Sequence, residues 1–291
     1  MKRERLGDAS IALLAIIEEE FDALKTLGNF TYRCPAENYF SRSAPVDNHY
    51  ELICARSDAW GNVLAGQAVC KLIEHFHPSF IILAGIAGGI IRKNDRNPIK
   101  PGDVMVVDYI HYSELKKLTN KEMEHRYIAH DHPSLLLRGS FAEPLKSSPG
   151  RWLGKIKAAP PVPTVPTVRL CNLVAGDTLL GDPESEFQQH IIERYATAVG
   201  VDMESFGVGR EIFTQRRDPY YNPQFLVIRG VSDLVYAADT TPPTKEASNE
   251  DGGKKSSEEN QAMRSAWRVY AAEAAAAFAL TVADDLMESL K

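Results

Sequence analysis

Short apolar runs recur along the sequence, with helical patterns between them. Runs of strand length, many of them β-branched, lie at 11–17, 50–55, 80–84, 104–110, 168–174, 198–201 and 225–231. Nearly continuous apolar runs are typical of strands that are covered on both faces. Apolar residues at helical spacing fill 63–75, 184–195 and 203–213, and an alanine-rich amphipathic pattern fills 266–290. Strands that alternate with helices predict an α/β fold around a largely parallel sheet.

Two segments show neither strand-length apolar runs nor apolar residues at helical spacing. Residues 160–166 are rich in proline and predict an extended connector into the next strand. Residues 240–260 carry Pro, Ser, Glu, Lys and Gly with almost no apolar side chains, which predicts a mobile loop. That loop is either a lid over a site or a tolerated surface insertion. Without an internal repeat or a shift in composition, residues 1–291 are interpreted as one domain.

Composition excludes several classes of protein. The chain has 291 residues and a net charge of −6, and it shows no basic stripe of the kind that binds nucleic acid. No run approaches the roughly 20 apolar residues of a membrane span. The first apolar run ends at Glu18, Glu19 and Glu20, unlike a secretory signal. The four cysteines are scattered, which favours free thiols in a reducing, cytoplasmic compartment, and the histidines predict no metal site.

The segment Phe225-Leu-Val-Ile-Arg-Gly-Val-Ser-Asp233 places an acidic residue after an apolar strand. In open α/β sheets, ligands bind at the carboxyl ends of such strands. A carboxyl group buried there has a raised pKa and can donate a proton near neutral pH. The segment therefore indicates a catalytic Asp233, with the alternative that Asp233 caps the next helix.

Further strand ends carry polar or glycine-rich motifs, and the set occurs in a characteristic order. These motifs are Ile11-Ala-Leu-Leu-Ala-Ile-Ile-Glu-Glu-Glu20, Ile82-Leu-Ala-Gly-Ile-Ala-Gly-Gly89, Lys100-Pro-Gly-Asp-Val104, Val174-Ala-Gly-Asp177 and Val199-Gly-Val-Asp-Met-Glu-Ser205. Together with the Ser-Asp segment, they resemble the nucleoside phosphorylase superfamily, especially the methylthioadenosine/S-adenosylhomocysteine nucleosidases. The resemblance runs from about residue 11 to the C-terminus. It implies a three-layer α/β/α fold with a mixed, mostly parallel central sheet.

The resemblance also implies a site for hydrolysing a purine nucleoside without a cofactor. Asp233 would protonate the leaving purine at N7, with Ser232 orienting it, and Glu20 would activate the attacking water. Glu204 would accept hydrogen bonds from the ribose hydroxyls, a strong interaction for a carboxylate, and Met203 would pack beneath the sugar. The substrate-binding set is completed by a glycine-rich turn and a downstream loop, namely Ala87, Gly88, Leu179 and Leu180. Asp177 is interpreted as structural.

The chain departs from the nucleosidase pattern at two places. Ile86 replaces the usual serine of the glycine turn, and Leu179 and Leu180 stand where a stacking phenylalanine is usual. The segment 266–278 and the Arg-Gly-Val-Ser-Asp block at 229–233 resemble instead the phosphorylase-like domains of immune and defence proteins, some of which are thought to cleave adenine nucleotides. In such an enzyme, Arg92 and Lys93 would hold a 5′-phosphate chain.

The sequence leaves other activities open. A phosphate-dependent phosphorylase is one alternative, but three glutamates at the N-terminal turn would repel phosphate at close range. A non-catalytic nucleoside sensor is another, although it would have no use for a water-activating Glu20. The partners expected are a purine nucleoside or nucleotide and, from the family resemblance, a homodimer or larger homo-oligomer.

Overall fold

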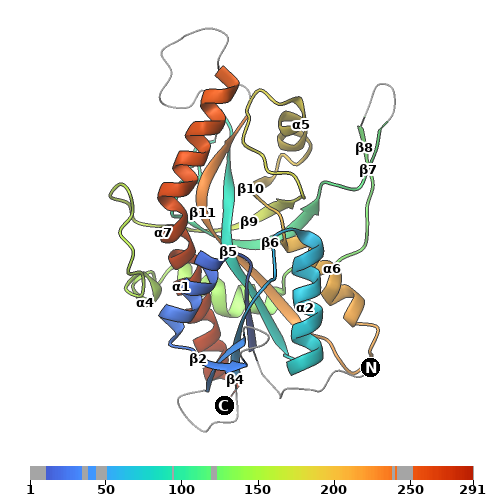
Figure 1. Ribbon diagram of the computed structural model, residues 1–291, viewed down its shortest axis with the longest axis vertical. Coiled ribbons are helices and arrows are strands. Elements are labelled where there is room, and N and C mark those ends of the chain that lie inside the picture. The colour runs from blue at the N-terminus through green and yellow to red at the C-terminus, as the bar shows by residue number, and fades with distance from the viewer. Residues whose placement is uncertain are drawn as a thin grey trace.

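The structure is a computed structural model that describes residues 11–34, 39–43, 51–93, 95–118, 123–237, 240 and 252–290. Within these residues, nine strands form one sheet with helices on both faces (Figure 1). The strands are β1 (Ile11–Ala15), β2 (Thr31–Cys34), β3 (Tyr39–Ser43), β4 (Glu51–Arg56), β5 (Phe80–Ile91), β6 (Val104–Tyr112), β9 (Val168–Ala175), β10 (Ala198–Asp202) and β11 (Gln224–Tyr236). Their order is β10-β9-β6-β11-β5-β1-β4-β3-β2. A separate hairpin joins β7 (Lys116–Leu118) to β8 (Met123–His125).

The sheet is mixed, as predicted. The pairs β1–β4, β1–β5, β5–β11, β6–β9 and β9–β10 are parallel, whereas β6–β11, β3–β4 and β2–β3 are antiparallel. Strand β10 also pairs antiparallel with β5, placing Gly200 opposite Gly89 and Val201 opposite Gly88. Because β10 contacts both β9 and β5, the strands β5, β11, β6, β9 and β10 close into a ring.

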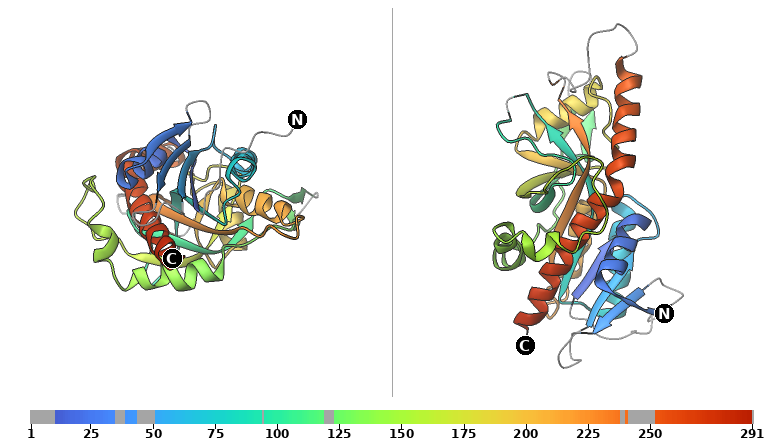
Figure 2. Two further views of the ribbon diagram at one scale, coloured as in Figure 1. Left: turned by 90° about the horizontal axis from the view of Figure 1, so that it is seen from below. Right: turned by 90° about the vertical axis from the view of Figure 1, so that its left-hand side faces the viewer.

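Helices cover the two faces and give the three layers that were predicted. The helices are α1 (Glu18–Gly28), α2 (Asn62–Phe76), the π-helix η2 (Leu137–Ala142), α3 (Glu143–Lys146), α4 (Gly150–Leu153), α5 (Glu186–Arg194), α6 (Ser205–Gln215) and α7 (Gly252–Ser289). The long helix α7 lies beside α1 on one face, and α2 and α6 pack together on the other (Figures 1 and 2). Each face has its own apolar core. No helix in the described residues is long and apolar enough to cross a membrane.

The alanine-rich composition of α7 has a packing reason. A Cβ added to Gly230 of β11 would lie 2.0 Å from the carbonyl oxygen of Ala271, so helix and strand approach at backbone distance. Alanines 271, 272 and 274–277 are buried at this contact. Larger side chains on the helix would hold it away from the sheet and leave voids.

Three sequence predictions need correction. Strand β5 continues through Gly85, Gly88 and Gly89 instead of turning there, because the ring of strands pairs with it along its length. For the same reason β11 runs on past Asp233, which lies at an irregularity in the β11–β5 register and not at a strand end. Helix α7 begins at Gly252, so the predicted loop 240–260 is helical over its last part. Residues 241–251 of that loop lie outside the described residues.

Candidate active site

One cavity of about 320 Å³ collects most of the predicted site residues. It lies where β10 meets β5 and β11, and where the first turn of α1 approaches α7. Its wall includes all the predicted catalytic and substrate-binding residues except one: Glu20, Ala87, Gly88, Leu179, Leu180, Met203, Glu204 and Asp233. The exception is Ser232, which is fully buried behind Asp233. Three carboxyl side chains from distant parts of the sequence therefore share one cavity.

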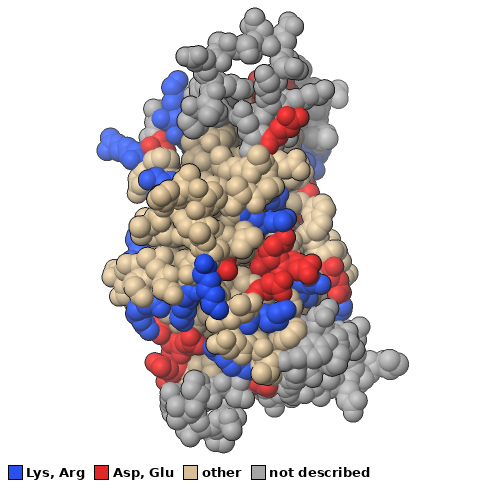
Figure 3. Space-filling view, turned by 60° about the vertical axis from the view of Figure 1, so that its left-hand side comes forward, with Lys and Arg blue, Asp and Glu red and all other residues tan. Residues whose placement is uncertain are grey.

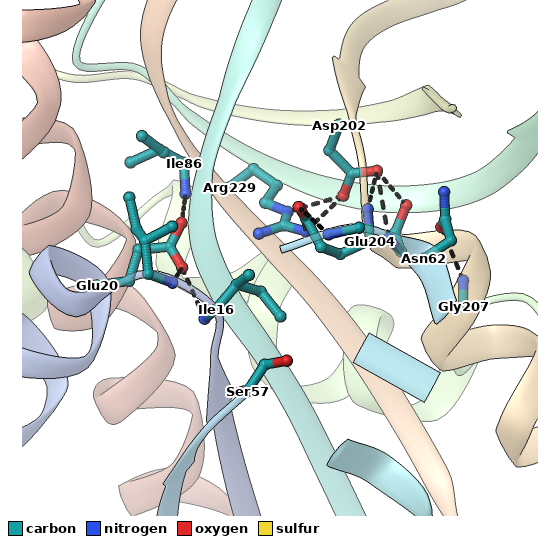
Figure 4. Close-up of polar contacts among 12 residues, drawn as sticks. Ile16, Glu20, Ser57, Asn62, Ile86, Asp202, Glu204, Gly207 and Arg229 are labelled. Carbon is teal, nitrogen blue, oxygen red and sulfur yellow. Dashed lines mark hydrogen bonds and ion pairs between the residues drawn. The ribbon is translucent and has the colours of Figure 1, made fainter. Parts of the chain in front are cut away.

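Glu20 is held by the backbone around it. Its Oε2 accepts hydrogen bonds from the N–H groups of Ile16 (2.8 Å) and Ile17 (3.0 Å), and its Oε1 accepts one from Ile86 (2.7 Å) (Figure 4). Burial raises the pKa of Glu20, while Arg229 and the three N–H groups act in the opposite direction. The helix N-terminus also favours a negative charge at this position. The carboxyl group is thus fixed in one orientation beside β5.

Arg229 links two of the carboxylates beneath the cavity. Its Nε and Nη2 donate to Oδ2 of Asp202 at 2.9 and 2.6 Å, and Nη2 also donates to Oε2 of Glu204 at 3.0 Å (Figure 4). The Arg229 side chain is completely buried. Burial raises the pKa of Glu204 to about 7, against the lowering effect of Arg229. Glu204 therefore changes its charge near neutral pH.

Gly85 lies between Glu20 and Arg229. A Cβ added there would be 2.4 Å from Oε1 of Glu20 and 2.5 Å from Nη1 of Arg229, so both groups occupy the space that a side chain would need. The same Nη1 is buried and has no hydrogen-bond partner among the described residues. A carboxylate acceptor and an unused N–H donor thus meet over one glycine.

Asp233 has a different environment from Glu20. Its Oδ1 accepts a hydrogen bond of 2.5 Å from the Ser232 hydroxyl, and its Oδ2 lies 3.5 Å from the point where a Cβ on Gly88 would stand. Burial raises the pKa of Asp233, and the Ser232 hydrogen bond and Arg264 lower it to a smaller extent. No backbone N–H in the described residues donates to this carboxyl group, so it gains protons more readily than an exposed aspartate.

Asp177 has a structural environment, consistent with its interpretation from the sequence. Its Oδ1 accepts hydrogen bonds from the backbone N–H (3.2 Å) and the side-chain amide (2.9 Å) of Asn62. Asn62 in turn accepts a hydrogen bond from the N–H of Gly207 at 2.9 Å. These contacts fix the start of α2 against the start of α6, directly beside Glu204.

The prediction that Arg92 and Lys93 hold a phosphate chain in the site is wrong. Both residues line a separate cavity, and the Arg92 guanidinium donates to the carbonyl oxygens of Ala198, Ile192 and Tyr195. Arg92 follows β5, and these hydrogen bonds tie it to the C-terminal end of α5 and to the start of β10. The described histidines also lie outside the site, and the described side chains include no group of three or more metal-binding residues that could hold an ion.

Sequence reasoning missed several polar or aromatic residues of the site or its supporting layer, among them Trp60, Asp202, Arg229, Arg264 and Arg268. The sequence did contain a signal for Arg229, because this arginine stands inside an apolar strand. A buried arginine almost always has a charged partner, so its position predicts carboxylates nearby. Arg264 and Arg268 gave no signal, because exposed arginines on an amphipathic helix are common. Lys and Arg alternate with Asp and Glu across the face that carries α7 (Figure 3).

The overall fold was compared with solved structures. Futalosine hydrolase of Helicobacter pylori matches with a TM-score of 0.66 and 16% identity, over 95% of this chain and 98% of that one. The chain shares its fold with this hydrolase. The methylthioadenosine/S-adenosylhomocysteine nucleosidase of Neisseria meningitidis, in complex with methylthio-immucillin-A, matches with a TM-score of 0.64 and 17% identity (94% and 98% covered).

The S-adenosylhomocysteine nucleosidase of Streptococcus pyogenes, in complex with 5-methylthiotubericidin, also matches, with a TM-score of 0.64 and 19% identity (96% and 98% covered). The predicted nucleoside phosphorylase-like fold is therefore confirmed. No protein-family model matches the sequence, and no curated protein matches it.

Proposed function

We propose that the protein is a purine nucleosidase that hydrolyses an N-glycosidic bond and releases adenine. The observation that supports this most is the shared cavity of Glu20, Glu204 and Asp233, whose surroundings differ. Cleavage of a glycosidic bond needs one group that gives a proton and another that activates water. Unequal environments allow one carboxyl group to be protonated while another is ionised.

Asp233 is the proton donor in this proposal. Its pKa is raised by burial, and a protonated carboxyl group can donate to N7 of the purine as the bond from C1′ to N9 breaks. The bonding electrons then move into the purine ring, and the leaving base is neutral. Ser232 keeps the carboxyl group in place through its hydrogen bond to Oδ1.

Glu20 activates the attacking water in this proposal. We place this water in the cavity beside the Glu20 carboxyl group, which forms part of the cavity wall and can accept a proton from it. The oxygen bonds to C1′ while the water proton passes to Glu20. The products are adenine and the free sugar, and solvent exchange restores both carboxyl groups.

Glu204 and Met203 hold the sugar. The ribose 2′- and 3′-hydroxyls donate to the Glu204 carboxylate, which Arg229 keeps oriented through Nη2. Met203 forms an apolar wall of the same cavity. Water is a better nucleophile here than phosphate because Glu20 and Glu204 lie at the cavity floor and would repel an anion at C1′.

The test is adenine release from methylthioadenosine, S-adenosylhomocysteine, adenosine and ATP, each with and without inorganic phosphate. We expect phosphate-independent release from at least one of them. Phosphate-dependent release would make the protein a phosphorylase, and binding without release would make it a sensor.

The variant Asp233→Asn should lose nearly all turnover and keep its melting temperature, because a neutral amide suits a buried position. The matched control is Asp22→Asn on the exposed side of α1, whose side chain is 54% exposed. The control should keep wild-type activity. Full activity in Asp233→Asn would contradict the role of Asp233 as the proton donor.

A further inference from the structure

Asp202, the last residue of β10, lies in the cavity wall, and its side chain is 1% exposed. Its Oδ1 accepts a hydrogen bond of 2.7 Å from the Ser205 hydroxyl and longer ones from the backbone N–H groups of Ser205 (3.3 Å) and Glu204 (3.4 Å). Its Oδ2 accepts two from Arg229, at 2.9 Å from Nε and 2.6 Å from Nη2. Protein donors thus take up the acceptor sites of both oxygens, so Asp202 acts on its neighbours and not on a ligand.

Arg229 is shared unequally between Asp202 and Glu204. Asp202 accepts the two short hydrogen bonds, whereas Glu204 accepts one, at 3.0 Å from Nη2. The other hydrogen bond that Glu204 accepts within the described residues comes from the N–H of Gly61 at 3.4 Å. A carboxylate has about four acceptor sites, so Glu204 keeps sites for the hydroxyl groups of a ligand. A guanidinium that faced Glu204 with two N–H groups would occupy those sites in a bidentate pair.

Three charged groups from three elements face the Glu204 carboxyl group, namely Arg229 of β11, Asp202 of β10 and Glu20 of α1. Burial raises the pKa of Glu204 to about 7, and the charges of Asp202 and Glu20 act in the same direction, against Arg229. Without the charge on Asp202, a like-charge repulsion would disappear and the N–H groups of Arg229 could turn to Glu204. Both changes favour the ionised form, so the pKa of Glu204 would fall.

We propose that Asp202 is a positioning residue of the reaction, which holds Arg229 by two hydrogen bonds and so leaves acceptor sites of Glu204 free for the sugar. The proposal rests on the proposed function, because it takes Glu204 as the acceptor for the ribose hydroxyls. Through Arg229, Asp202 determines how many acceptor sites Glu204 offers and the pH at which Glu204 becomes ionised. The enzyme then binds its substrate well only when the pH is high enough to ionise Glu204.

A purely structural role for Asp202 is the competing explanation, since its Oδ1 contacts join the end of β10 to the start of α6. Two kinds of variant separate the roles. Asp202→Asn and Asp202→Ser both remove the charge, and serine also keeps an acceptor suited to a helix N-terminus. Ser205→Ala removes the 2.7 Å hydrogen bond to Oδ1 but leaves the contacts between Asp202 and Arg229 in place.

The experiment follows kcat/KM for adenine release between pH 5 and pH 9. The substrate is whichever of methylthioadenosine, S-adenosylhomocysteine, adenosine and ATP the wild type uses best. The matched control is Asp285→Asn, because Asp285 also accepts two hydrogen bonds from one arginine, Arg151 (3.0 and 2.5 Å), but lies outside the cavity. Circular dichroism checks that each variant is folded.

We expect activity in the wild type to fall on the acid side as Glu204 gains its proton, with a midpoint near pH 7. In the charge-free variants of Asp202 this midpoint should move to lower pH by about one unit or more. At pH 8 their KM should be higher than that of the wild type, because Arg229 then occupies acceptor sites of Glu204. Ser205→Ala and Asp285→Asn should keep the wild-type midpoint. An unchanged midpoint in the charge-free variants, or an equal shift in Ser205→Ala, would overturn the proposal.

A second measurement isolates Glu204 from Glu20 and needs no activity. Urea unfolding at pH 8 compares Glu204→Gln with its parent in the wild-type background and in the charge-free background of Asp202. Glutamine should stabilise the wild type, because the raised pKa of Glu204 makes the ionised side chain unfavourable in the folded state. In the charge-free background this gain should shrink to less than half. An equal gain in both backgrounds would overturn the role of Asp202, whereas a failure to release adenine from any compound would overturn the proposed function and leave this comparison valid.

Discussion

Replacing Glu204 with glutamine should stabilise the protein at alkaline pH and leave its stability almost unchanged in mild acid. Burial raises the pKa of Glu204 from 4.5 to about 7, so the folded protein holds a proton that the unfolded chain releases. Between these two values the folded state binds more protons, and its stability therefore falls as pH rises through about 7. Glutamine has the shape of the protonated side chain, and its amide oxygen can still accept the hydrogen bond from Nη2 of Arg229.

The size of the effect follows from the same shift. A difference of about 2.5 pKa units corresponds to about 3 kcal/mol at 1.36 kcal/mol per unit. For a chain of this size, that is a rise of roughly 6–12 °C in melting temperature at pH 8. At pH 4.5 the two proteins should unfold within about 0.5 kcal/mol of each other.

The assay is urea unfolding of the wild type and Glu204→Gln from pH 4.5 to 8. The control is Glu18→Gln, because Glu18 lies on the same edge of the fold but its side chain is 76% exposed. The control should follow the wild-type curve at every pH. Lower stability of Glu204→Gln at pH 8, or a difference from wild type that is the same at pH 4.5 and pH 8, would refute the reasoning. In the activity assay the variant should be impaired, because the proposed function makes the Glu204 carboxylate the acceptor for the ribose hydroxyls.

Two further substitutions test the layer that supports the cavity. Gly85→Ala should lower kcat by more than tenfold, because its Cβ would displace Glu20 or Arg229. The control Gly139→Ala, on an exposed helical position with no atom within 4 Å of the new Cβ, should leave activity intact and stability equal or higher. Equal activity in both variants would argue against the proposed role of Glu20. Arg229→Met should cost about 3–5 kcal/mol in urea unfolding at pH 8, since it leaves Asp202 and Glu204 buried without a cation. That loss should shrink as the Glu204 carboxyl group gains a proton in acid, and a loss independent of pH would point to packing alone.

Much of the fold follows from the sequence because burial on two faces leaves a strong pattern. The apolar runs at 11–17, 104–110 and 168–174 became β1, β6 and β9 with ends shifted by a few residues. The ends of β5 and β11 could not be predicted in this way. Glycine and aspartate are normally turn residues, and only pairing with distant strands keeps Gly88 and Asp233 in extended conformation.

The candidate site was predictable where a motif fixes a residue's position locally. Glu20 follows β1 within the first turn of α1, and Glu204 directly precedes α6. Contacts between distant segments were not predictable. Arg264 follows Asp233 by 31 positions and reaches the cavity only because α7 packs at backbone distance on Gly230. No local sequence pattern predicts that α7 packs so closely on β11.

The pairing of β10 with β5 closes a ring of strands, and this ring makes one part of the cavity more rigid than the rest. Gly88, Gly89, Gly200 and Val201 are held by strand pairs within the ring, so their amide hydrogens should be among the slowest to exchange with solvent. The rim of the cavity has no such constraint, since the side chains of Trp60, Arg264 and Arg268 are exposed or partly exposed. Evolution could therefore exchange the side chains at this rim while leaving the buried carboxyl groups of the cavity unchanged. In this fold, the side chains at the rim can change without a change in the buried carboxyl groups.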